Sequence, residues 1–149
     1  MIVIIVSYTA RFVVVTLMIQ IIWMRLSGMK TQSAKAKGRR FQQWVRTILI
    51  EKLSVHPEDI ESRSMGAGGE DLIMARAARE KFPYSIECKN QESLNVWKSY
   101  EQAESNAGDY EPILFIKRNN QKPLVVVDAD YFVSLHNRVA KEYDIDELL

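Results

Sequence analysis

The stretch GGEDLIMARAAREKFPYSIECK, residues 68–89, decides the expected fold. It opens with a glycine-rich loop, and residues 71–74, which begin with Asp71, predict a short apolar strand. Residues 75–81 favour a turn of helix, and residues 84–88 have the pattern of a second strand. The stretch therefore predicts strand, helix and strand, with a carboxylate where the first strand begins.

The second predicted strand carries an acid and a base on one face. Because side chains alternate across a strand, Glu87 and Lys89 project together while Ile86 and Cys88 face the opposite layer. If the two strands pair, Asp71 and Glu87 can share one hard divalent cation, because Mg²⁺ prefers oxygen ligands and retains waters. Lys89 would then orient a water or neutralise charge in a transition state.

The sequence around this stretch predicts further helices and strands. Residues 41–53 place apolar side chains at helical spacing, with Ser33 as a candidate N-terminal cap. Strand patterns occupy residues 60–64, 113–117 and 124–127, and helical patterns occupy residues 94–106 and 130–139. Helices with one apolar stripe each predict an α/β fold, with a central mixed β-sheet flanked by helices.

The N-terminal segment differs from the rest. Residues 1–24 are almost entirely apolar, and all 19 acidic residues of the chain follow residue 28. Residues 1–28 therefore predict a hydrophobic helix that precedes a domain at 29–149. An apolar run of this length can anchor a chain in a membrane, with the basic flank after it in the cytoplasm. Alternatively, the natural protein starts at Met29 and residues 1–28 are an upstream extension of the reading frame.

The composition excludes several classes of protein. The chain of 149 residues is 47% hydrophobic and 26% charged, which excludes a collagen-like or wholly disordered chain. Its lone Cys88 excludes an intramolecular disulfide framework and a zinc site made of several thiolates. We expect Cys88 to be a small buried apolar residue rather than a nucleophile. Trp97 and Tyr100 are expected in the core rather than as platforms for stacking bases.

The order of these motifs resembles a known superfamily. The pattern GGED-x15-ECK, preceded by KGRRF at residues 37–41, resembles the PD-(D/E)xK nucleases, and within them archaeal-type Holliday-junction resolvases and related phage endonucleases. The likeness covers roughly residues 35–135. It implies a restriction-endonuclease-like core and a Mg²⁺-dependent endodeoxyribonuclease, with Mn²⁺ as a substitute metal. Branched or junction DNA would be the substrate, in DNA recombination or repair.

The resemblance also implies site residues, an assembly and a location. Asp71 and Glu87 would be metal ligands, Lys89 the catalytic lysine, and Ser64 a hydroxyl near the scissile phosphate. Gln102 would contact the site or DNA. A homodimer is expected, because resolvases cut two strands symmetrically. The location would be cytoplasmic, in a host cell if the protein is phage-encoded.

One position departs from the family pattern. The acid that usually follows the aromatic residue of the first helix is replaced here by Gln42. A glutamine can ligate through its carbonyl oxygen but contributes no charge. Either the metal site is weaker, or a neighbour such as Glu70 or Glu51 substitutes.

Basic residues gather before the first amphipathic helix. Residues 30–46 contain six bases and no acid, which favours phosphate contacts or, alternatively, a membrane-flanking or disordered arm. The candidate DNA-binding residues are Lys35, Lys37, Arg39, Arg40, Arg63 and Gln102. Two other functions stay open: a catalytically silent DNA-binding module with the nuclease fold, and a membrane-tethered interaction protein.

Overall fold

The computed structural model describes the backbone of residues 2–64 and 68–146, and the side chains of residues 15–24, 32–64 and 68–139. The helices are α1 (Ile2–Leu53), α2 (Arg76–Lys81), α3 (Val96–Asn106) and α4 (Ala129–Asp146), and the 3-10 turn η1 spans Pro57–Asp59. The strands are β1 (Ile60–Ser62), β2 (Leu72–Met74), β3 (Tyr84–Asn90), β4 (Glu111–Lys117) and β5 (Leu124–Val126). The chain divides into two compact units, Met1–Lys37 and Gly38–Leu149, and the second unit is a mixed α/β domain.

The predicted start of the first amphipathic helix is wrong. Ser33 lies inside α1, which is helical from Ile2 to Leu53. Residues 30–40 are mostly Lys, Arg, Ala and Gln, which have high helix propensity, and this stretch contains no proline. The end of the helix at Leu53 is as predicted, and Ser54 follows it with a positive φ of 50°.

The strands form two small sheets. Strands β1 and β2 pair antiparallel, whereas β3 pairs parallel with β4, and β4 pairs antiparallel with β5. The second sheet is therefore mixed, as expected. The strands predicted at 71–74 and 84–88 do not pair in a regular ladder. They belong to different sheets, which are joined through Asp71, whose N–H donates to the Ile86 carbonyl at 2.8 Å.

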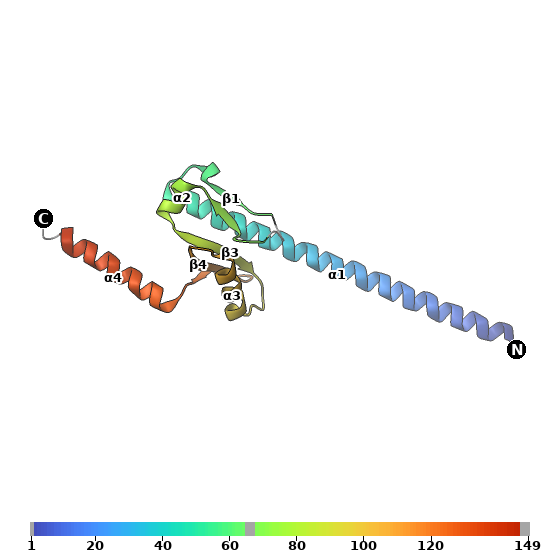
Figure 1. Ribbon diagram of the computed structural model, residues 1–149. Coiled ribbons are helices and arrows are strands. Elements are labelled where there is room, and N and C mark those ends of the chain that lie inside the picture. The colour runs from blue at the N-terminus through green and yellow to red at the C-terminus, as the bar shows by residue number, and fades with distance from the viewer. Residues whose placement is uncertain (1, 65–67, 147–149) are drawn as a thin grey trace. The chain divides into compact units, whose positions relative to one another are not determined.

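The two faces of the β3–β4–β5 sheet pack against different helices. Tyr84, Ile86 and Ile113 pack into the main core with Phe41 and Val45 of α1, all at most 9% exposed. Helix α3 packs against β3 and β4 and buries Ser99 and Ala103. Figure 1 shows the part of α1 that belongs to the second unit, from Gly38 onward, and helix α3 on opposite sides of these strands. The alternation predicted for β3 is confirmed, and it places Glu87 and Lys89 on the α3 side.

Among the residues whose side chains are described, no helix combines the length and the apolar character needed to cross a membrane. The hydrophobic segment predicted at residues 1–28 is helical from Ile2 onward. Its interpretation as a membrane anchor rests largely on side chains 1–14 and 25–28, which lie outside the described residues.

Candidate active site

Strand β3 supplies the acid and the base at the centre of the candidate site. Lys89 Nζ donates to Glu87 Oε1 at 2.5 Å, and the two side chains are 19% and 4% exposed. Gln102 of α3 links both, since its Nε2 donates to Glu87 Oε1 at 3.0 Å and its Oε1 accepts from Lys89 Nζ at 3.0 Å. Asn106, one turn further along α3, donates to Glu87 Oε2 at 3.3 Å. Glu87 is thus a buried carboxylate held by three donors.

Asp71 is positioned by the strand that carries Glu87. Its N–H donates to the Ile86 carbonyl, and its Oδ2 accepts from the Cys88 N–H at 2.7 Å. The Asp71 carboxylate therefore takes the place that a main-chain carbonyl would have in a continued ladder. Because Ile86 and Cys88 flank Glu87, these two bonds hold the two acids beside each other, as the sequence led us to expect.

Burial and the nearby acid change the protonation of Asp71. Burial first, and the negative charge of Glu87 second, raise the pKa of Asp71 from 3.8 to about 6. The Cys88 N–H, Lys89 and Arg63 act in the opposite direction without overcoming the increase. Lys89 and Arg63 therefore do not fully offset the effects of burial and of the Glu87 charge on the ionised form of Asp71. An added cation at this position would be favoured electrostatically.

Gln42 of α1 is 2% exposed. Its Nε2 donates to the Asp71 carbonyl at 2.5 Å and to the Arg63 carbonyl at 3.3 Å. An ionised glutamate at this position could not donate these bonds. The structure thus gives Gln42 a positioning role next to Asp71.

Two arginines hold the described end of the glycine-rich loop. Arg63 Nε donates to the Glu70 carbonyl at 2.8 Å, and its guanidinium lies over Gly69, where an added Cβ would meet Arg63 Cζ at 3.2 Å. Arg79 of α2 pairs with the Glu70 carboxylate at 2.7 Å and stacks on the Tyr110 ring at 4.1 Å. The pair with Arg79 uses Glu70 Oε1, whereas Glu70 Oε2 is buried without a hydrogen-bond partner among the described residues, so Glu70 as a substitute ligand stays a prediction.

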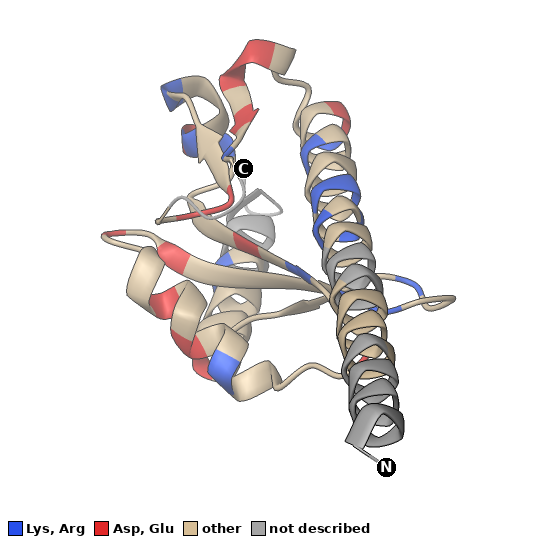
Figure 2. Cartoon of the chain, turned by 90° about the vertical axis from the view of Figure 1, so that its right-hand side faces the viewer, with Lys and Arg blue, Asp and Glu red and all other residues tan. Residues whose placement is uncertain are grey.

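The other alternative ligand and the basic residues lie elsewhere. Glu51 is exposed on α1, and no described interaction links it to the cluster. Arg39 and Arg40 are exposed on α1 close to Gln42 in sequence, and Figure 2 shows the basic residues recurring along this helix. Lys35 and Lys37 belong to the first unit, whose position relative to the cluster is not defined. Ser64 is exposed and immediately precedes residues 65–67, which are outside the described residues.

Sequence reasoning missed Asn106 and misplaced Trp97. The signal for Asn106 was available, because it lies four residues after Gln102 and thus on the same helix face. Trp97, expected in the core, is 80% exposed, because α3 turns its Ser99 and Ala103 face to the sheet. Cys88 packs partly against the core as expected, and burial raises the pKa of its thiol well above the ordinary value.

Comparisons of the chain with protein-family models, curated proteins and solved structures found no match. Any function must therefore be argued from the cluster itself.

The donor set of the cluster suits a hard divalent cation. Within the described residues, no group of three His, Cys, Asp or Glu side chains gathers at one place. Mg²⁺, however, is commonly bound by one or two carboxylates with waters and substrate phosphates filling the remaining positions. Asp71 and Glu87 supply these carboxylates, and burial together with the Glu87 charge disfavours the ionised form of Asp71 when no cation is present. The residues present therefore fit such an ion.

Proposed function

We propose that this chain is a divalent-metal-dependent DNA endonuclease with a restriction-endonuclease-like core. The observation that carries the proposal is the cluster of Asp71, Glu87 and Lys89, in which two acids and one lysine are brought together at strand β3. This arrangement supports the resemblance to PD-(D/E)xK nucleases. The choice of branched or junction DNA rests on that resemblance and is part of the proposal.

The chain's own residues have distinct roles in this proposal. Asp71 and Glu87 would hold the cation, which when bound would polarise a phosphoryl oxygen and lower the pKa of a water. Hydrolysis forms a bond from the water oxygen to phosphorus and breaks the bond from phosphorus to the leaving oxygen, which then takes up a proton. Lys89, held by Glu87 and Gln102, keeps an ammonium beside the developing negative charge.

A catalytically silent DNA-binding module is the second candidate. The observation that favours it is the use of the Gln42 amide for two main-chain bonds, which leaves the site with two carboxylates instead of three. Both candidates bind DNA, so a binding assay does not separate them. They differ in cleavage and in the dependence of cleavage on metal.

The test is cleavage of labelled four-way junction, duplex and single-stranded DNA by the full chain, with Mg²⁺ and with Mn²⁺. We expect cutting that requires the metal and that Lys89→Ala reduces by at least about 100-fold, as losing one electrostatic stabiliser does. Lys52→Ala is the matched control, because Lys52 is an exposed lysine on α1. Cleavage that survives Lys89→Ala would reject this site, and DNA binding without any cleavage would favour the silent module.

A further inference from the structure

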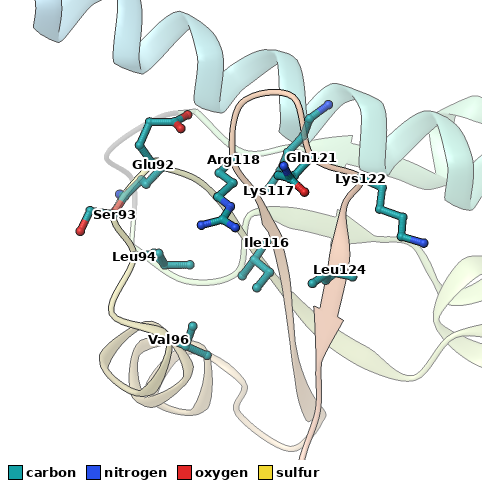
Figure 3. A pocket seen from close by; sticks show the side chains of 11 residues that line it. Glu92, Ser93, Leu94, Val96, Ile116, Lys117, Arg118, Gln121, Lys122 and Leu124 are labelled. Carbon is teal, nitrogen blue, oxygen red and sulfur yellow. The ribbon is translucent and has the colours of Figure 1, made fainter.

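A cavity of about 510 Å³ lies at the carboxyl ends of the parallel strands β3 and β4, next to the proposed site. Figure 3 shows it between the segment that carries Glu92, Ser93 and Leu94 and the hairpin that joins β4 to β5. Ligands commonly bind at this edge of parallel sheets. The volume lies in the range of small-molecule sites, which is large enough for a nucleotide unit.

The sheet register connects this cavity to Lys89. Lys89 pairs with Ile116 of β4, and Ile116 pairs with Leu124 of β5. Paired residues of adjacent strands project to the same face, so Lys89, Ile116 and Leu124 form one row across the sheet. Ile116 and Leu124 line the cavity, as does Gln91, which lies two residues beyond Lys89. At about 3.3 Å per residue, Lys89 and Gln91 are about 7 Å apart along the strand.

The lining combines apolar and cationic groups. Leu94, Val96, Ile116 and Leu124 provide apolar surface, and Lys117, Arg118 and Lys122 are cations. The lining also contains one acid, Glu92, whose carboxylate accepts from the Asn119 N–H. None of these three cations forms an ion pair with another residue that the structure describes. In Figure 3, Arg118 extends into the space beside Leu94 and Ile116, whereas Lys122 points away from it. Unpaired cations around apolar surface are the features that proteins use to hold single-stranded nucleic acid.

The walls of the cavity are held by hydrogen bonds of their own. Gln91 N–H donates to the Lys117 carbonyl at 3.0 Å, and Asn119 N–H donates to the Glu92 carboxylate at 2.7 Å. These bonds tie the segment after β3 to the β4–β5 turn. The cavity is thus formed in the free protein, which reduces the ordering cost of binding a ligand there.

We propose that this cavity binds an unpaired DNA nucleotide next to the strand being cut, with the base against Ile116 and Leu124 and its phosphate against Arg118. The inference rests on the proposed function, because it names the feature of the substrate that the nuclease recognises. We therefore expect the protein to bind DNA that has a single-stranded segment more tightly than blunt duplex DNA.

The test is the affinity of the full chain for a labelled oligothymidylate of about 20 nucleotides and for a blunt duplex of the same length, measured in EDTA by fluorescence anisotropy. We expect Arg118→Ala to weaken oligothymidylate binding about tenfold, the loss of one charge-assisted contact. The slope of log affinity against log salt should fall by about 0.7. Duplex affinity should change less than about twofold.

Two controls make the result decisive. Lys52→Ala removes the same charge from an exposed site that does not line the cavity, and we expect it to leave oligothymidylate binding within about twofold. Leu124→Ser removes apolar surface from the cavity without changing the charge, and it should weaken oligothymidylate binding. The proposal is overturned if Arg118→Ala and Lys52→Ala have equal effects, if duplex binding falls as much as oligothymidylate binding, or if an oligouridylate binds more tightly.

Failure of this inference and failure of the nuclease proposal are distinguishable. Cleavage tests the nuclease through Lys89→Ala, and oligothymidylate binding tests the cavity through the difference between Arg118→Ala and Lys52→Ala. If the chain never cleaves DNA but Arg118→Ala weakens oligothymidylate binding, the cavity proposal stands and the nuclease proposal is rejected. If the chain cleaves DNA but Arg118→Ala does not change oligothymidylate binding, the nuclease proposal stands and the cavity proposal is rejected.

Discussion

Replacing Asp71 by asparagine should make the protein more stable at neutral and alkaline pH. The Asp71 carboxylate is partly buried beside Glu87, so its ionised form is disfavoured in the folded state. Asparagine retains an oxygen that can accept the Cys88 N–H but carries no charge. The substitution should therefore remove an electrostatic penalty while it keeps the hydrogen bond that joins Asp71 to β3.

The magnitude follows from the pKa of Asp71. Its increase from 3.8 to about 6 corresponds to about 3 kcal/mol between the two protonation states. Because the side chain is partly exposed, solvent screening reduces the effect on the free energy of unfolding, and we expect about 1–2 kcal/mol.

The sign of the pH dependence is determined by the direction of the shift. A carboxyl whose pKa is higher in the folded state binds its proton more tightly there. Its contribution to stability is fully present below pH 3.8 and is lost as the pH rises through about 6. The advantage of the Asp71→Asn variant should therefore be small near pH 4 and reach its full size by about pH 8.

The assay is urea unfolding of both proteins at about pH 4.5 and about pH 8, followed by circular dichroism. Other groups titrate in both proteins, so the difference between the two isolates Asp71. Asp109→Asn is the control, because Asp109 is exposed. A difference that stays constant with pH, or a variant that is less stable at about pH 8, would refute the reasoning. Adding Mg²⁺ at this pH should raise the stability of the original protein more than that of the variant.

Three further substitutions test the packing around the cluster, each by the free energy of unfolding from urea titration. Gln42→Leu should cost about 1–3 kcal/mol, because the part-buried Asp71 and Arg63 carbonyls each lose one hydrogen bond, although the Arg63 N–H still donates to the Asp71 carbonyl; an unchanged value would argue against the positioning role. Arg79→Met should cost about 3–5 kcal/mol by leaving Glu70 without its partner, and adding Glu70→Gln should restore much of it; no recovery would show that the ion pair is not the cause. Ile86→Ala should cost about 2–5 kcal/mol because Ile86 is fully buried, and a smaller loss would contradict its place in the core.

The sequence by itself determined most of the elements of the second unit. Local patterns predicted the strands near residues 60, 72, 84, 113 and 124 and the helices that follow them, with ends differing by a few residues. Alternation along β3 was enough to place Glu87 and Lys89 on one face. These features depend on neighbours within a few positions, which is the range over which periodicity and propensity operate.

The tertiary structure decided how these elements meet. Asp71 lies beside Glu87 because its side chain replaces a ladder carbonyl between Ile86 and Cys88, and no local pattern encodes that bond. Gln42 contacts the Asp71 loop from 29 residues away, and Trp97 faces solvent because the other face of α3 is the one that packs. Each of these depends on partners distant in the chain. Hydrogen bonds and burial between such partners exist only once the helices and the sheet have packed together.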